Sequence, residues 1–146
     1  MRIYAFMLLV SLSIGEAKAS NLTVFDAGEG LMARILTSKS AVLVDTGSLL
    51  KIRDNLDKLE RSQDIPLTDL IITHLHPDHA SGIFEILARY PQIRVFDNCM
   101  PQIDVSDGDL IRWTSELLST VKRRECINQN SKLIFDDVQI QVLWPL

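Results

Sequence analysis

The sequence lacks the features that mark several simple classes of protein. Lys and Arg number 15 against 19 Asp and Glu in 146 residues. So weak an acidity gives no charge-driven affinity for bulk nucleic acid or for an anionic membrane. Two cysteines are too few for a disulfide scaffold, and 47% apolar with 23% charged residues excludes a disordered chain. Without an internal repeat or a linker, the length suits one domain.

No apolar stretch is long enough to cross a bilayer, and the longest lies at the N-terminus. Residues 3–14 would rise about 18 Å as a helix, short of a hydrocarbon core of about 30 Å. Arg2 precedes the stretch and small residues follow it at Ala17 and Ala19. This pattern predicts a signal peptide over residues 1–19 and a periplasmic or secreted protein without stable membrane insertion, an uncleaved anchor being the alternative.

Export would place the two cysteines in an oxidising compartment. A disulfide between Cys99 and Cys126 would then stabilise the fold by about 3–4 kcal/mol through loop closure. Two buried, unpaired thiols are an equal alternative, because the sequence does not measure the separation of the two residues.

The spacing of apolar residues predicts alternating strands and helices of the α/β class. Strands are expected at 21–26, 31–36, 41–44, 70–72 and 93–96, helices at 49–59 and 80–87, and a closing hairpin over 132–143. A strand at 110–113 is predicted to lead into a helix over 114–125. In its last turn the cations of residues 122–124 would meet the negative end of the helix dipole.

All three histidines of the chain fall within six residues, directly after a short buried strand. The run is His74, His76, Asp78 and His79, with Pro77 between the second and third. Imidazole nitrogens and carboxylate oxygens suit Zn²⁺. In an extended segment His74 and His76 point to the same side and can hold one ion. Pro77 bends the path, which displaces Asp78 and His79 towards a second ion about 3.5–4 Å away.

The loop THLHPDHASG at residues 73–82 resembles the signature of the metallo-β-lactamase-fold hydrolases. The strand-end sequence Val44-Asp45-Thr46-Gly47 looks like that family's other early mark. Residues 25–30 and 142–145 are similar to the ComEC-type DNA-uptake branch. The resemblance implies a metallo-β-lactamase αββα sandwich over residues 20–146, truncated to its first half.

The family resemblance also implies roles for five side chains. His74 and His76 would bind the first metal, and Asp78 and His79 the second, while Asp45 would steady the metal loop from behind. In the family a metal-bound hydroxide, which Asp78 helps to hold, attacks a carbonyl carbon or a phosphorus. The implied function is that of an exported zinc-dependent hydrolase of a phosphodiester, ester or amide, with a small-molecule or nucleic-acid substrate.

The chain departs from the family downstream of this loop. The family adds two further histidines and a bridging aspartate, whereas this chain has no fourth histidine, and Asp136 and Asp137 fit a hairpin turn. Two interpretations stay open: a fragment of a hydrolase that holds two zinc ions, or a non-catalytic remnant that holds one or none. Half a sandwich would leave a sheet face uncovered, which predicts a homodimer that hides it.

Overall fold

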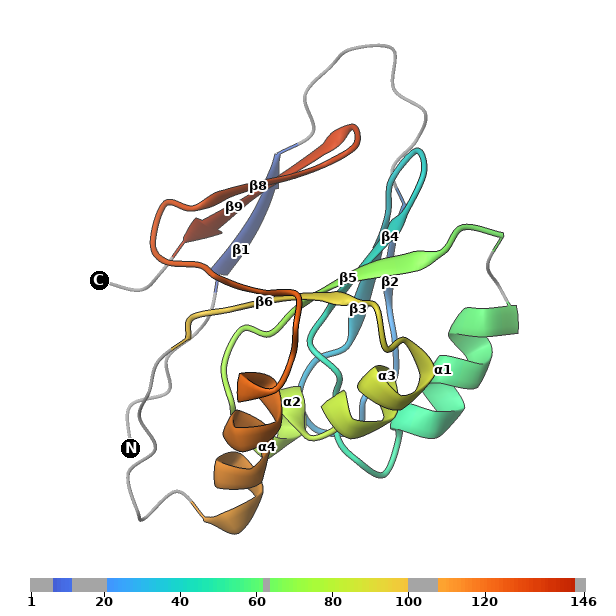
Figure 1. Cartoon of the computed structure of the whole chain (residues 1–146). Coiled ribbons are helices and arrows are strands. Elements are labelled where there is room, and N and C mark those ends of the chain that lie inside the picture. The colour runs from blue at the N-terminus through green and yellow to red at the C-terminus, as the bar shows by residue number, and fades with distance from the viewer. Residues whose placement is uncertain (1–6, 12–20, 62–63, 100–107, 144–146) are drawn as a thin grey trace.

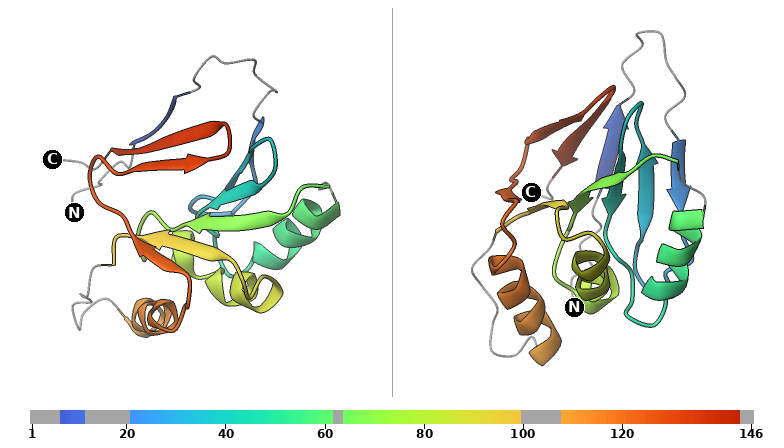
Figure 2. Two further views of the ribbon diagram at one scale, coloured as in Figure 1. Left: turned by 45° about the horizontal axis from the view of Figure 1, so that its top comes forward. Right: turned by 45° about the vertical axis from the view of Figure 1, so that its right-hand side comes forward.

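The protein folds into three layers (Figure 1). The computed structural model describes residues 7–11, 21–61, 64–99 and 108–143. A six-stranded sheet lies between a layer of helices and a three-stranded sheet (Figures 1 and 2). The elements of this part are β1 (Met7–Ser11), β2 (Asn21–Val24), β3 (Ala33–Leu36), β4 (Ala41–Val44), α1 (Ile52–Arg61), β5 (Leu67–Ile71), α2 (Pro77–Ala80), α3 (Ile83–Arg89), β6 (Arg94–Asp97), α4 (Asp109–Ser119), β7 (Arg124–Cys126), β8 (Lys132–Phe135) and β9 (Val138–Leu143). The α/β class is confirmed.

The large sheet brings the carboxyl ends of five strands, β2 and β4 to β7, to one edge. Its order is β2-β3-β4-β5-β6-β7, antiparallel from β2 to β4 and parallel from β4 to β7. Parallel neighbours need a crossover, and here helices supply each one, so the segments after β4 and β5 emerge side by side. Ligand sites of such sheets lie at this edge.

Apolar residues on both faces of the large sheet explain why it lies in the middle. Leu43, Leu70 and Val95 pack against the helices, whereas Val42, Val44 and Ile71 pack against β8 and β9. Strands buried on both faces read as continuous apolar runs, as β4 does with all four residues buried. The amphipathic helix α1 turns Ile52, Leu56 and Leu59 inward.

Two expectations for the region after residue 108 are wrong. Residues 110–113 are not a strand but part of α4, because a short apolar run fits either period equally well. The helix ends at Ser119, so the cations of residues 122–124 lie beyond it and do not meet its dipole. Arg124 instead opens β7 and binds Asp97 of β6, with nitrogen–oxygen distances of 2.7 and 2.8 Å.

The described part of the predicted leader is a strand. Met7–Ser11 pairs with β9 in an antiparallel register from Met7↔Leu143 to Ser11↔Gln139. The predicted cleavage site before Ser20 lies outside the described residues, and removal of the leader stays a prediction. Among the helices that the structure describes, none has the length and apolar character needed to cross a membrane.

The two cysteines are joined. Cys99, just after β6, and Cys126, the last residue of β7, form a disulfide with a Cα–Cα distance of 5.2 Å. Of the two alternatives that the sequence left open, the structure therefore has the bridge. It ties the outermost parallel strand to its neighbour at the same edge from which the histidine loop emerges.

Candidate metal centre

The three histidines gather at the carboxyl end of β5. The chain leaves this strand at Ile71, runs on to His74 and His76, and enters α2 at Pro77. The ring of His74 lies 4.7 Å from that of His76 and 4.1 Å from that of His79, measured between ring centroids. The predicted clustering is therefore seen, and it depends on the short helix that turns His79 back towards His74.

Asp45 organises this cluster from the neighbouring strand end. It is fully buried and has a positive φ of 56°. Its Oδ1 accepts the backbone N–H of Thr73 at 2.7 Å, and its Oδ2 accepts the Thr73 hydroxyl at 2.7 Å. The Nδ1 of His79 also lies 2.7 Å from Oδ2. One carboxylate thus holds both ends of the histidine loop.

The hydrogen bonds select a tautomer for two imidazoles. An ionised carboxylate only accepts, so Nδ1 of His79 carries the proton that it donates to Asp45. The Thr73 hydroxyl uses its one proton on Asp45, so at 3.0 Å it accepts from Nδ1 of His74. Both rings therefore keep the lone pair of Nε2, the atom that a metal ion needs.

Burial and charge shift the pKa values of these two rings in opposite directions. Burial is the largest cause that lowers the pKa of His74, and the nearby His79 adds to it. Burial also acts to lower the pKa of His79, but the hydrogen bond and charge of Asp45, together with Asp78, outweigh it and raise that pKa. The ring of His74 is thus the more readily available neutral ligand.

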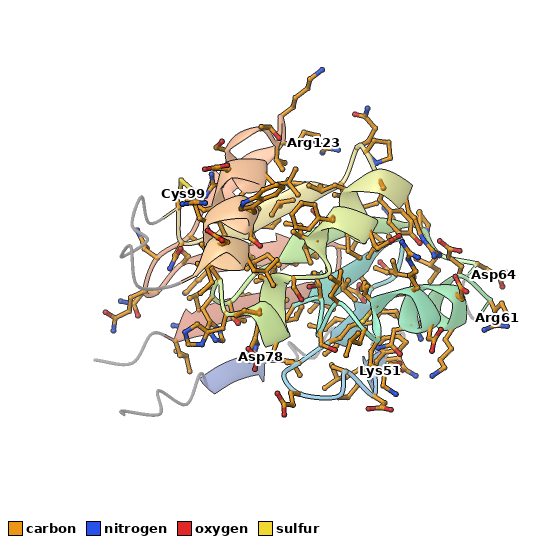
Figure 3. The ribbon with its side chains drawn as sticks, turned by 90° about the horizontal axis from the view of Figure 1, so that it is seen from below. Lys51, Arg61, Asp64, Asp78, Cys99 and Arg123 are labelled. Atoms are coloured by element: carbon orange, nitrogen blue, oxygen red, sulfur yellow. A yellow bond between two sulfur atoms is a disulfide. The ribbon has the colours of Figure 1, made fainter. Side chains whose placement is uncertain are left out.

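Asp78 lies in the first turn of α2, and its side chain is 40% exposed. Its Oδ2 lies 3.5 Å from Nε2 of His79, on the side of the ring that faces away from Asp45. Figure 3 shows Asp78 at the end of the short α2 ribbon, beside the loop that follows β2. Its carboxylate is therefore placed to share an ion with His79.

The side chains are of the types that bind a metal ion, but their donor atoms do not point at one common position. Two imidazoles with free Nε2 atoms, an exposed third one at His76 and a half-exposed carboxylate are the donors that Zn²⁺ takes. As they stand, no three His, Cys, Asp or Glu side chains within the described ranges meet the geometry of a metal site. Binding therefore requires side-chain rotation, for which the exposed His76 has room.

Two polar side chains near the ends of β4 and β5, Thr73 and Asp136, have distinct roles. Thr73 links Asp45 to His74, a role that the motif does not predict, and its place directly before the first histidine is the sole signal in the sequence for it. Asp136 binds Thr37 and Ser40 in the turn that leads into β4, at the opposite edge from the histidines. The expectation that it serves a hairpin and not the metal is consistent with this placement.

Part of the chain is similar to known proteins. Residues 27–95 match the family described as the Metallo-beta-lactamase superfamily. The chain is 36% identical over 73 residues to a hydroxyacylglutathione hydrolase of Tolumonas auensis, covering 50% of this chain and 26% of that protein. It is 33% identical over 91 residues to the lactamase-like protein aptB of Emericella nidulans, covering 58% and 29%.

A solved structure shares the fold. The putative metallo-beta-lactamase of Thermotoga maritima superposes with a TM-score of 0.55 at 18% identity, over 79% of this chain and 62% of that one. The matched segment spans between a quarter and a third of the two curated relatives.

Proposed function

We propose that this chain, whose residues 27–95 match the Metallo-beta-lactamase superfamily, binds zinc through the histidine cluster and serves the hydrolysis of an acyl compound. His74 and His76 would hold one ion and Asp78 and His79 a second. The observation that carries the proposal is the pair of hydrogen bonds at Nδ1 of His74 and His79, which leaves both Nε2 atoms free. When bound, zinc lowers the pKa of water to about 7 and polarises the bond under attack.

The residues of the chain contribute orientation and proton handling. Asp45, which is buried, fixes the His79 ring and the Thr73 backbone, so these two parts of the loop are held while the exposed His76 rotates to complete the site. The Oδ2 atom of Asp78 lies 3.5 Å from Nε2 of His79, and the Asp78 side chain is 40% exposed. It would accept a hydrogen bond from the water that attacks and so orient its lone pair.

The substrate class is proposed from the relatives. Acyl glutathione carries its acyl group on sulfur, so a hydroxyacylglutathione hydrolase in the family supports a thioester or ester substrate. A phosphodiester is the second candidate, because residues 25–30 and 142–145 are similar to the ComEC-type branch. Of these, Trp144 and Pro145 lie outside the described residues. Both reactions need a water or hydroxide nucleophile and a polarised oxygen on the carbon or phosphorus under attack, so the same ligands would serve either.

Hydrolysis of two probes by the zinc-loaded chain tests the proposal. S-lactoylglutathione represents the acyl class and bis(p-nitrophenyl) phosphate the diesters, and Asp78→Ala and His76→Ala are the matched variants. Turnover of the first probe that both variants abolish supports the acyl function. Turnover confined to the second would move the chain to the diesterases. Zinc binding without turnover of either supports the alternative of a non-catalytic metal-binding remnant.

Export and self-association complete the proposal. The Cys99–Cys126 disulfide favours an oxidising compartment such as the periplasm or the exterior, as the predicted leader does. Ile134 of β8 is 70% exposed, whereas its neighbours Leu133 and Phe135 pack inward against the large sheet. Because both faces of the large sheet are covered, the homodimer expected on an open sheet face is proposed instead on this outer face of the small sheet, and a monomeric mass in solution would exclude it.

A further inference from the structure

We propose that Gly30, in the loop between β2 and β3, is a positioning residue that sets the place of Asp78. The inference rests on the metal-binding role proposed above for Asp78. Gly30 belongs to the turn of residues 26–30, which supplies no ligand in the metal-binding proposal. This turn passes beside Asp78 in Figure 3.

The contact between Gly30 and Asp78 is made by main-chain atoms. Gly30 has a φ of +89°, a conformation that glycine adopts without strain. A Cβ atom on Gly30 would overlap the carbonyl oxygen of Asp78 and lie 2.5 Å from its carbonyl carbon and 2.9 Å from its Cβ. None of these atoms can rotate away, so any side chain at this position must push the two loops apart.

The turn of residues 26–30 is anchored by hydrogen bonds and close packing, so it limits how far the main chain at Asp78 can move towards it. Asn55 of α1 donates from Nδ2 to the carbonyl oxygen of Asp26 at 2.9 Å, and Ser48 donates from Oγ to that of Ala27 at 2.9 Å. Gly47 approaches Ala27 so closely that a Cβ on it would lie 2.8 Å from the Ala27 side chain. The turn is thus anchored on the segment that follows β4, which also carries Asp45.

The opposite side of α2 is held from the same segment. The carbonyl oxygen of His79 accepts the backbone N–H of Thr46 at 2.7 Å and its hydroxyl at 3.1 Å. The Thr46 oxygen in turn accepts the N–H of Gly82 at 2.9 Å. The main chain at Asp78 therefore lies between Gly30 on one side and the hydrogen bonds of Thr46 to His79 on the other. Because the Asp78 side chain is short, this main-chain placement limits the positions that its carboxylate can reach by rotation.

Zinc titration of the full-length chain, with no substrate present, tests this role. Gly30→Ala is expected to weaken zinc binding about tenfold, as loss of a supporting contact does at metal sites. Gly28→Ala is the matched control, because Gly28 has a φ of +75° but a Cβ there meets its nearest neighbours at 3.6 Å. It carries the same backbone strain without the clash, and its zinc affinity should stay within about threefold of wild type.

A double-mutant cycle separates positioning from general damage. When Asp78 is already alanine, Gly30→Ala should change zinc affinity little, because the ligand that it displaces is gone. Equal losses in both backgrounds would overturn the inference, as would an unchanged affinity in Gly30→Ala when Asp78→Ala weakens binding. If the wild type binds no zinc, or Asp78→Ala leaves binding unchanged, the proposed metal centre fails, and the inference fails with it.

A milder variant serves if Gly30→Ala does not fold. Ser48→Ala removes the bond that holds Ala27 and adds no atom, so the turn can withdraw from Asp78. Thr37→Val is a more severe change at the opposite edge of the sheet, because the Thr37 hydroxyl contacts the Ser40 carbonyl at 2.8 Å, accepts the Ser40 N–H and also binds Asp136. A fall in zinc affinity of about threefold or more for Ser48→Ala alone supports the inference. Equal effects of the two variants overturn it.

Discussion

Replacing Asp45 with asparagine changes one oxygen to an amide nitrogen at the most connected point of the site. Oδ1 can remain an oxygen and keep the backbone bond to Thr73. The new NH₂ group then stands where Oδ2 accepts from both the Thr73 hydroxyl and Nδ1 of His79, each at 2.7 Å. Since the amide nitrogen only donates, both partners must become acceptors.

This reversal moves protons on two rings. Nδ1 of His79 must present its lone pair, so the proton moves to Nε2 and blocks the atom proposed to bind metal. The Thr73 hydroxyl, released from Asp45, turns its proton towards His74 at 3.0 Å, which drives the same exchange there. A single isosteric change thus disfavours the ligand tautomer of both imidazoles without leaving a cavity.

The expected cost is a 10- to 100-fold loss of zinc affinity, or about 1.4–2.8 kcal/mol. Zinc competition against a chromophoric chelator measures the affinity. Long-range ¹H–¹⁵N correlation spectra of the metal-free protein report the tautomers directly, and in Asp45→Asn the proton should appear on Nε2 of both rings. The wild-type spectra should show it on Nδ1.

Asp69→Asn is the matched control. This carboxylate is also buried, yet it accepts from Arg94 at 2.7 Å and contacts no histidine. It should lower the free energy of unfolding without altering zinc affinity or tautomers. The tautomer reasoning is refuted if Asp45→Asn keeps zinc affinity within about threefold of wild type, or if Asp69→Asn weakens it equally.

Three further outcomes follow from the fold. Cys126→Ser removes the disulfide to Cys99, which lies 27 residues earlier in the chain. The free energy of unfolding measured in denaturant melts should fall by about 3.5 kcal/mol. Reductant should cause the same loss in the wild type and no change in the variant. Burial and the hydrogen bond to Glu60 raise the pKa of Tyr90 to about 12. Because the folded protein favours the neutral phenol, Tyr90 contributes its full stabilisation below about pH 10 and loses it as the pH rises through about 12. Tyrosinate absorbance should follow this titration of Tyr90, and Glu60→Gln should lower the pH of its midpoint. Leu56→Ala, at a fully buried position of α1, should destabilise by about 2–5 kcal/mol in the same melts without changing the hydrogen bonds of the site.

Helices and strands could be predicted where the apolar residues followed a single helical or strand spacing. The helix of residues 49–59 corresponds to α1, Ile52–Arg61, because apolar residues at spacings of three and four admit one interpretation. The buried strand before His74 was predicted from a continuous apolar run and is β5. Prediction failed at residues 110–113, where four residues are too few to separate a strand from the first turn of α4.

The donor set of the candidate site could be predicted without a structure, because His74, His76, Asp78 and His79 are neighbours in the chain and imidazole and carboxylate are metal ligands in any fold. Which of their nitrogens are free to bind could not be predicted in this way. That choice depends on Asp45, 28 residues before Thr73, and it exists because parallel strands β4 and β5 end at the same edge. The tertiary structure also sets where Asp78 lies, since Gly30 meets it through main-chain atoms, and contacts between distant segments leave no local pattern in a sequence.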